Sequence, residues 1–365
     1  MGSARSVTIN GLKIGGGAPV RVESMLKSRL TDLAACLRET ERLAVISEHV
    51  RRIRAKFAAA GCELARVALP DIALAPAFAA LVKQSPLTLM ADIHFDHRLA
   101  LAAIDSGCSS VRINPGNMSH AAGLAEVVAA AEANGVVIRI GANGGSLNNA
   151  QLDRCGGDRG AALVLAVEEQ LRLLLDKNFS NVIISAKSSS VAETVRANLL
   201  LANKYPFPLH VGITEAGNGN SGVVKGAAGI ALMLSQGAGD TLRVSLTAPG
   251  EEEVETGYNI LAALGLRSRG WELVSCPTCG RRRVEVAELV ARLKKLLPPA
   301  AAPGVTVAVM GCEVNGPKEA AGADFGVAGC PDGFIVFKKG AFVCHGSMDE
   351  FEEIVTREFA ELLNQ

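Results

Sequence analysis

The stretch that decides the fold is residues 182–204, VIISAKSSSVAETVRANLLLANK. Its first six residues are apolar or small up to a final lysine, which is typical of a buried strand, and the segment that follows has the length and Ala/Leu content of a crossover helix. The same alternation recurs along the chain. The predicted strands are residues 20–25, 64–69, 87–94, 110–114, 136–143, 182–187, 209–215 and 241–247. Strands separated by helices in this way predict an α/β fold, a (β/α)8 TIM-like barrel.

Polar and charged residues stand at the carboxyl ends of the predicted strands. They are Asp71, His94, Arg112, Asn114, Arg139, Asn143, Lys187, Glu215, Arg243 and Ser245. In a barrel these ends lie on one face, where active sites are built from strand ends and the loops that follow. Any one of these residues could simply cap a helix or end a strand. The set as a whole predicts a functional site, because solvent-facing turns do not require this concentration of charge.

The sequence changes character after Thr247. Residues 251–264 predict one more helix, and residues 267–270 predict a turn. We therefore expect the barrel to occupy residues 1–265 and a small α+β domain to occupy residues 266–365. In that second domain the pattern predicts strands at 271–274 and 305–310, a helix at 284–297, a hairpin across 333–343 and a closing helix at 348–363.

The composition fits an ordinary globular protein. The 365 residues are 49% hydrophobic, and 37 basic residues balance 37 acidic ones. This balance argues against nucleic acid or a membrane surface as a partner, and the longest apolar runs fall short of the roughly 20 residues that cross a bilayer. The nine cysteines are an odd number with no secretory signal ahead of them, so we expect a reduced, cytoplasmic protein.

Three cysteines of the second domain form the most specific motif. Cys276 and Cys279 enclose Pro and Thr, and Cys312 lies in the run MGCEVNGPKEA at 310–320. A Cys-x-x-Cys pair alone can be a redox dithiol, half of a zinc site or half of an iron–sulfur site. The third cysteine argues against the simple redox dithiol.

The fourth ligand separates the two remaining interpretations. A structural zinc site would need one more Cys or His, and the candidates are Cys330, Cys344 and His345. Glu319 follows Cys312 in a Gly/Pro-containing loop and could instead supply an oxygen ligand. Three thiolates and one oxygen would leave one iron of a cluster replaceable, as Lewis-acid chemistry on a substrate oxygen requires.

Motifs along the whole chain resemble the family of 4-hydroxy-3-methylbut-2-enyl diphosphate synthases, the iron–sulfur enzymes of the non-mevalonate isoprenoid pathway, in their bacterial two-domain form. The matching runs are CPTCGR at 276–281, GCEVNGP at 311–317, ADIHFD at 91–96, RINPGN at 112–117, GITEAG at 212–217 and RVSLT at 243–247. The resemblance implies an oxidoreductase. Its substrate, 2-C-methyl-D-erythritol 2,4-cyclodiphosphate, would take two electrons, lose water and open to 4-hydroxy-3-methylbut-2-enyl diphosphate.

The resemblance also implies roles for particular residues. A [4Fe-4S] cluster would be held by Cys276, Cys279, Cys312 and Glu319, with an exchangeable fourth ligand. The barrel glutamate Glu215 would handle protons on the substrate, so Glu215 and Glu319 are the expected catalytic residues. The expected substrate contacts are Arg66, His94, Arg112, Arg139, Asn143, Lys187, Arg243 and Ser245. Arginine suits a cyclic diphosphate because its fork-shaped guanidinium binds phosphate oxygens two at a time.

Partners follow from the same resemblance. The electrons would come from flavodoxin or ferredoxin, and the protein would be a homodimer in which the barrel of one subunit faces the cluster domain of the other.

His210 could belong to the site or be a buried barrel histidine, and the pattern does not decide between them. The run Gly217-x-Gly219-x-x-Gly222 matches a dinucleotide fingerprint, but it follows the seventh predicted strand. We interpret it as a tight turn or a backbone anion cradle near the diphosphate.

Three positions depart from the family pattern. Glu23 replaces a usual glutamine, residues 47–57 form a basic extension of the first helix, and Lys318 replaces a usual glycine beside Glu319. If that glycine adopts a positive φ, a lysine there would be strained. Two other functions remain open: a zinc-stabilised barrel aldolase or lyase that uses Lys187 for a Schiff base, and a non-catalytic paralogue that binds a cluster as a sensor.

Overall fold

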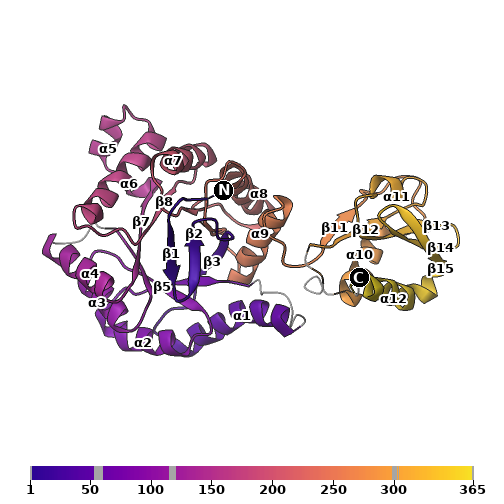
Figure 1. Ribbon diagram of the computed structural model, residues 1–365, viewed down its shortest axis with the longest axis horizontal. Coiled ribbons are helices and arrows are strands. Elements are labelled where there is room, and N and C mark those ends of the chain that lie inside the picture. The colour runs from indigo at the N-terminus through magenta and orange to yellow at the C-terminus, as the bar shows by residue number, and fades with distance from the viewer. Residues whose placement is uncertain (1, 53–60, 115–120, 298–301, 303, 364–365) are drawn as a thin grey trace. The chain divides into compact units, whose positions relative to one another are not determined.

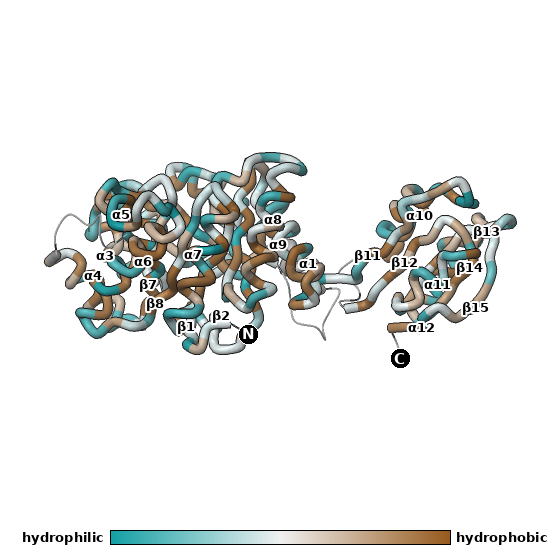
Figure 2. Tube along the Cα trace, turned by 90° about the horizontal axis from the view of Figure 1, so that it is seen from above, coloured by the Kyte–Doolittle hydropathy of each residue, from teal (hydrophilic) through white to brown (hydrophobic). Residues whose placement is uncertain are grey.

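The chain divides into two compact units in the computed structural model, which describes residues 2–52, 61–114, 121–297, 302 and 304–363 (Figure 1). The larger unit contains most of the chain up to Leu266, and the smaller one contains Arg267 onward. Figure 2 shows hydrophobic segments concentrated toward the interior of each unit. Within the described ranges no helix combines the length and the apolarity that a membrane span requires.

The larger unit is a barrel of parallel strands. Its strands are β3 (Arg21–Met25), β4 (Leu64–Ala68), β5 (Thr88–Asp92), β6 (Ser110–Ile113), β7 (Val137–Asn143), β8 (Val182–Lys187), β9 (His210–Val211) and β10 (Thr241–Leu242). They pair in the order β8-β7-β6-β5-β4-β3-β10-β9. A parallel bridge between Ile184 and Leu209 joins β8 to β9, so the ring closes. The predicted fold and all eight predicted strands are confirmed, although β9 and β10 are shorter than expected.

Helices surround this barrel on the outside (Figure 1). They include α1 (Leu33–Arg52), α2 (Ala75–Gln84), α3 (His97–Asp105), α4 (Ala121–Ala133), α5 (Asn149–Arg154), α6 (Arg159–Leu175), α7 (Val191–Lys204), α8 (Gly219–Ser235) and α9 (Gly250–Ala263). Several begin at a side-chain cap: Asp96, Asp158 and Ser190 accept hydrogen bonds from the first turns of α3, α6 and α7. Residues 47–52 of the basic segment lie in α1. Residues 53–57, the side chains of the whole segment and residues 115–117 of the RINPGN run fall outside the described residues.

An antiparallel hairpin that the sequence analysis did not predict covers the amino-terminal end of the barrel. It consists of β1 (Ser6–Ile9) and β2 (Leu12–Gly15). Its buried side chains Val7, Ile9 and Ile14 pack against Leu64, Met90, Val137 and Ile183 near the beginnings of four barrel strands. The turn Asn10-Gly11 has positive φ at both residues, which is the pattern of a two-residue type I′ hairpin turn. The carboxyl end of the barrel is thus left for the site.

The smaller unit is a mixed sheet with helices. Its strands are β11 (Glu272–Ser275), β12 (Thr306–Met310), β13 (Phe325–Cys330), β14 (Gly333–Lys338) and β15 (Ala341–Gly346), paired in that order. The helices are α10 (Val286–Leu296), α11 (Gly316–Glu319) and α12 (Phe351–Leu363). Strand β13 was not predicted, because Gly326 and Gly329 weaken its strand pattern. Gly326 is needed there, since a Cβ atom would collide with the ring of Phe337.

Candidate active site

The carboxyl ends of the barrel strands surround a pocket of about 230 Å³. All the predicted substrate contacts line it: Arg66, His94, Arg112, Arg139, Asn143, Lys187, Arg243 and Ser245. The lining also includes residues that were not predicted or were left undecided: Asp92, Ser185, His210 and Thr214. Four arginines and a lysine facing one enclosed space create a positive potential that attracts an anion. The structure therefore brings the predicted residues together, while their contacts with a substrate stay a prediction.

Asp92, which was not predicted, organises one side of this pocket. Its carboxylate lies 3.5 Å from Nε of Arg66, 3.4 Å from Nη1 of Arg112 and 3.7 Å from Nε2 of His94. Burial alone would raise the pKa of Asp92, but the hydrogen bond with His94 and the charges of both arginines hold it well below its usual range. Burial lowers the pKa of Arg66 to about 10, so its guanidinium is still cationic at neutral pH. An ionised Asp92 thus fixes three donors at the end of β5.

A buried ion pair lies beneath the same pocket. Oε2 of Glu23 is 2.5 Å from Nη1 of Arg139, and both side chains are at most 1% exposed. Oε1 of Glu23 and Nη2 of Arg139 have no hydrogen-bond partner among the described residues. Burial favours the neutral acid, but the charge and hydrogen bond of Arg139 outweigh it and lower the pKa of Glu23. Arg139 therefore reaches the pocket from a position that Glu23 fixes.

His210 lies in the site. Its Nε2 is 2.8 Å from Nζ of Lys187, its Nδ1 is 2.7 Å from Oγ1 of Thr241, and Nδ1 is 3.4 Å from Oε2 of Glu23. Burial lowers the pKa of Lys187 well below its usual value, and repulsion by Arg66 and Arg139 lowers it further. Burial also lowers the pKa of His210 well below its usual value, and the charge of Lys187 lowers it further. Protons on this pair are therefore weakly held, which suits groups that exchange protons with a bound anion.

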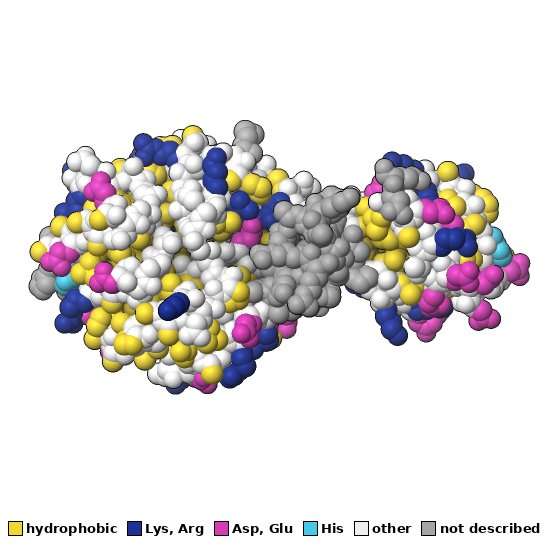
Figure 3. Space-filling view, turned by 60° about the horizontal axis from the view of Figure 1, so that its bottom comes forward, with side chains coloured by type: hydrophobic (Ala, Val, Ile, Leu, Met, Phe, Trp, Pro, Cys, Tyr) yellow, Lys and Arg dark blue, Asp and Glu magenta, His cyan; other side chains and the backbone are white. Residues whose placement is uncertain are grey.

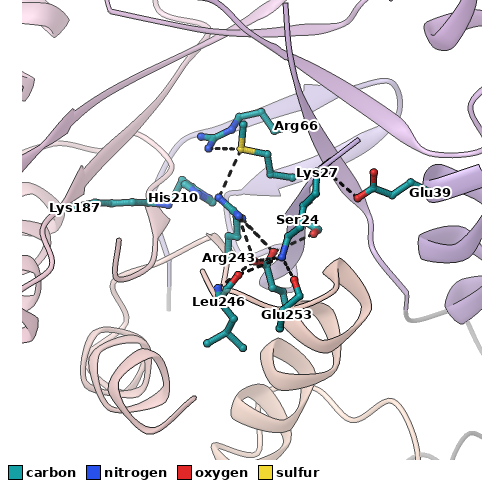
Figure 4. Close-up of polar contacts among 11 residues, drawn as sticks. Ser24, Lys27, Glu39, Arg66, Lys187, His210, Arg243, Leu246 and Glu253 are labelled. Atoms are coloured by element: carbon teal, nitrogen blue, oxygen red, sulfur yellow. Dashed lines mark hydrogen bonds and ion pairs between the residues drawn. The ribbon is translucent and has the colours of Figure 1, made fainter. Parts of the chain in front are cut away.

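A third buried carboxylate, that of Glu253, holds Arg243 in place (Figure 4). Glu253 of α9 lies 3.3 Å from Nη2 of Arg243 and 3.2 Å from Nζ of Lys27, and it accepts hydrogen bonds from Ser24 Oγ at 3.2 Å and Leu246 N at 3.1 Å. These contacts join strand β3, the loop after β10 and helix α9. The sequence analysis treated residues 251–253 only as the start of a helix, because no local pattern shows that Glu253 turns inward. Its four partners fix the loop that carries Ser245.

The thioether of Met25 contacts two of the pocket arginines. Its Sδ is 3.0 Å from Nη2 of Arg66 and 3.8 Å from Nη1 of Arg243. A sulfur is only a weak acceptor. Met25 therefore spaces the two guanidinium groups without neutralising either charge.

Glu215 does not line the pocket, in contrast to the predicted substrate contacts. It is exposed, and its backbone is left-handed with φ 52°. It follows the lining residue Thr214 directly, so its side chain starts at the pocket edge. Beyond it, Gly217 has a φ of 111°, and a Cβ atom on Gly222 would lie 2.8 Å from the carbonyl carbon of Gly217. The glycine run is therefore a tight turn that begins α8, as we interpreted it.

A second pocket, of about 190 Å³, lies in the smaller unit. The four predicted cluster ligands Cys276, Cys279, Cys312 and Glu319 all line it. The backbone N–H of Gly311 donates a hydrogen bond to Sγ of Cys276 at 3.1 Å, as expected beside a thiolate.

Two backbone features shape this thiol pocket. Thr278, between the first two thiols, has a φ of 67°, which is rare for a β-branched residue and is typical of functional loops. Lys318 lies inside the short helix α11 and is not among the residues with positive φ. The strain that a positive φ would have caused at Lys318 is therefore absent.

The thiol pocket suits a cluster better than a single zinc ion. Three thiols and one carboxylate line this pocket, whereas a structural zinc site would normally take a Cys or His as its fourth ligand. A four-iron cluster takes one ligand at each iron, so its ligands stand around a volume and not around a point. Cys330 and Cys344, the thiols considered for zinc, do not line this pocket. The residues present therefore fit a [4Fe-4S] cluster.

The fold and the two pockets define a barrel protein with a cationic, anion-binding site and a separate three-thiol site on an appended domain. Comparison with known families narrows this class. A family model described as "GcpE TIM-barrel domain" matches residues 4–258, and a second model, described as "GcpE protein C-terminal domain", matches residues 272–362. The chain belongs to the GcpE family.

Curated relatives match along nearly the whole chain. A protein of Lawsonia intracellularis is 41% identical over 98% of this chain and 97% of its own length, and one of Maridesulfovibrio salexigens is 44% identical over 95% and 92%. Both are named 4-hydroxy-3-methylbut-2-en-1-yl diphosphate synthase (flavodoxin). Membership of this family confirms the resemblance seen in the sequence and favours an enzyme of isoprenoid biosynthesis over the aldolase and the sensor.

Proposed function

We propose that the protein catalyses the reductive ring opening and dehydration of 2-C-methyl-D-erythritol 2,4-cyclodiphosphate to 4-hydroxy-3-methylbut-2-enyl diphosphate. The observation that carries this proposal is the gathering of every expected substrate contact around one pocket at the carboxyl end of the barrel. The names of the curated relatives, which specify the diphosphate product and flavodoxin, support the same reaction. By its chemistry the enzyme is an oxidoreductase.

In this proposal the barrel pocket binds the cyclic diphosphate. The two phosphate groups accept hydrogen bonds from Arg66, Arg112 and Arg243, which are positioned by Asp92 and Glu253 before substrate arrives. Guanidinium groups that are already fixed in place lose little conformational entropy when the substrate binds, so each contact contributes more to the binding free energy. Arg139 adds positive charge at the floor of the pocket, where a buried charge is screened least by salt.

The thiol pocket provides the redox centre. Cys276, Cys279, Cys312 and Glu319 would hold a [4Fe-4S] cluster, which, when bound, supplies electrons one at a time and a replaceable metal corner for a substrate oxygen. The N–H of Gly311 stabilises the negative charge on the Cys276 sulfur. Glu319 is exposed at the end of α11, a position from which its carboxylate can give way.

Residues at the edge and floor of the barrel pocket would carry out the proton transfer. Ring opening with loss of water needs a proton for the departing hydroxyl oxygen, and Glu215 is our candidate donor. To act, the Glu215 side chain would turn from solvent toward the pocket that its neighbour Thr214 lines. Lys187 and His210, which contact each other at 2.8 Å and hold their protons weakly, would relay a proton next to the phosphates.

We further propose a cytoplasmic homodimer that receives electrons from flavodoxin, with ferredoxin as the alternative donor. The boundaries of the two functional domains would be residues 1–265 for substrate binding and 266–365 for the cluster. The function is tested by anaerobic reconstitution with iron and sulfide, followed by an assay with the cyclic diphosphate and a chemical reductant. We expect a brown protein with broad absorbance near about 410 nm that forms the linear diphosphate. A coloured protein without turnover would refute the catalytic proposal.

A further inference from the structure

The rim of the thiol pocket carries a cluster of positive charge that the proposed chemistry does not use. Arg281, Arg282 and Arg283 follow Cys279 after Gly280, and Lys318 precedes Glu319 in the short helix α11. All four side chains are exposed, and Arg281 and Arg282 also line the pocket itself. We call these four residues the basic rim.

Most of the basic rim has no countercharge in the described parts of the chain. Arg282 pairs with Glu285 at 2.9 Å, but the two side chains are 48% and 59% exposed, so this pair contributes little. No ion pair is found there for Arg281, Arg283 or Lys318. Their charges are therefore available to a partner.

The backbone that carries the rim is nevertheless fixed against the thiol loops. The N–H of Arg283 donates to the carbonyl of Gly311 at 2.7 Å, and the N–H of Arg282 donates to the carbonyl of Cys279 at 3.1 Å. These bonds hold the charged loop at a set place beside Cys276, Cys279 and Cys312. The rim is thus a constant feature of the pocket entrance.

Negative charge in the same unit gathers elsewhere. The exposed carboxylates of its last helical segment are Asp349, Glu350, Glu352, Glu353 and Glu361. Figure 3 shows many of the Asp and Glu side chains of the smaller unit toward one margin, with others among Lys and Arg side chains on the same face. None of the carboxylates of this last helical segment lines the thiol pocket.

We propose that the basic rim is the docking surface for the electron donor, a small acidic protein whose redox group is framed by carboxylates. This inference rests on the proposed function and identifies where the donor binds. An electron donor has to approach the redox centre closely, and two rim residues, Arg281 and Arg282, line the pocket that would hold the cluster. Complementary charge speeds such encounters and orients them, and redox interfaces need only a small contact area. The exposed side chains of Pro277 and Val314 supply an apolar centre between the charges.

Substrate phosphate is the competing ligand for the rim. The barrel pocket already offers four arginines and Lys187 to the diphosphate, and all five side chains are held by carboxylate or imidazole contacts that fix their direction. The rim side chains are exposed and, apart from Arg282, unpaired in the described residues, so they are suited to a broad acidic surface and not to one compact ligand. The following experiment distinguishes an acidic partner protein from substrate phosphate as the ligand of the basic rim.

The test compares two double charge reversals in the full-length protein. Arg283→Glu/Lys318→Glu inverts two rim residues that do not line the thiol pocket, and Lys294→Glu/Lys295→Glu makes the same change in net charge at two exposed lysines near the end of α10. Val286, at the start of α10, packs near Gly311, and Lys294 lies about 12 Å further along the helix axis. The conservative variant Arg283→Lys/Lys318→Arg keeps the charge and should keep the binding.

Binding of oxidised flavodoxin is measured by calorimetric titration, with and without the cluster, at about 20 mM and about 300 mM salt. We expect the rim reversal to raise the Kd at least about tenfold at low salt, with little effect at high salt, and the control reversal to change it less than about twofold. In turnover, the rim reversal should raise the KM for flavodoxin while activity with dithionite is unchanged.

Two results would overturn the docking surface. An unchanged Kd for flavodoxin would show that the donor binds elsewhere, and an equal loss of activity with dithionite would show that the rim serves the substrate or the cluster. Failure of the proposed function would look different, because the wild-type protein would then turn over the cyclic diphosphate with neither reductant.

Discussion

Replacement of Glu23 by glutamine tests the buried foundation of the barrel pocket. Glu23→Gln keeps the shape of the side chain but leaves the guanidinium of Arg139, which is 1% exposed, without its counterion. Two unit charges about 4 Å apart attract by about 4 kcal/mol at an effective dielectric constant of about 20. Loss of one partner of a buried pair typically costs about 3 to 5 kcal/mol. We therefore expect Glu23→Gln to lower the free energy of unfolding by about 3 kcal/mol.

The matched control is Glu168→Gln. Oε1 of Glu168 lies 2.5 Å from Nζ of Lys204, the same separation as in the buried pair, but the two side chains are 23% and 58% exposed. The same substitution there should cost less than about 1 kcal/mol. Both variants are compared with wild type by urea unfolding followed by circular dichroism. Equal losses of unfolding free energy in Glu23→Gln and Glu168→Gln would refute the reasoning that burial increases the stability contribution of the Glu23–Arg139 pair.

The stability difference between wild type and Glu23→Gln should also depend on pH, in a direction that follows from the pKa of Glu23. The pKa of Glu23 is lowered from 4.5 in the folded protein, so the folded state favours the ionised carboxylate. Its contribution is complete above the unfolded pKa of 4.5 and is lost as the pH falls through the lower folded pKa. The difference in stability between wild type and Glu23→Gln should therefore shrink as unfolding is measured at increasingly acidic pH. A difference that grows with acid would contradict the assignment.

Three further substitutions test the two pockets. Cys312→Ser should abolish the absorbance near about 410 nm together with turnover, because one iron loses its thiolate; retained colour would exclude Cys312 as a ligand. Glu215→Gln should keep that absorbance and lose at least about 100-fold in kcat, the scale of one general acid; wild-type kcat would remove Glu215 from the mechanism. Asp92→Asn should raise the KM for the cyclic diphosphate about tenfold or more, because Arg66 and Arg112 lose the charge that orients them; steady-state kinetics with an unchanged KM would show that those arginines are positioned by other contacts.

The sequence predicted the barrel well because its signals are local. A buried parallel strand is a continuous apolar run, and eight such runs with polar ends gave both the strands and the lining of the pocket. The lengths of β9 and β10 were overestimated, because regular pairing ends at Val211 and Leu242; just beyond, Gly212 lies so close to Arg243 that a Cβ atom would collide with its carbonyl oxygen. The hairpin β1–β2 was missed although Asn10-Gly11 marks its turn.

The supporting residues of the site could not be predicted, because their partners are distant in the chain. Glu23 and Arg139 are 116 positions apart, and Ser24 and Glu253 are 229 apart. A carboxylate at the start of α9 looks like an ordinary helix-terminal charge until tertiary packing turns it inward. The same limit applies to His210, whose contact with Lys187 depends on closure of the barrel between β8 and β9.

Product formation measured against iron content tests the central claim most directly. Protein reconstituted anaerobically to different extents is supplied with the cyclic diphosphate and dithionite, and the linear diphosphate is quantified by mass spectrometry. We predict that the rate rises in proportion to iron and reaches its maximum at about four iron atoms per chain. A protein that holds this iron and still leaves the cyclic diphosphate intact would contradict the account.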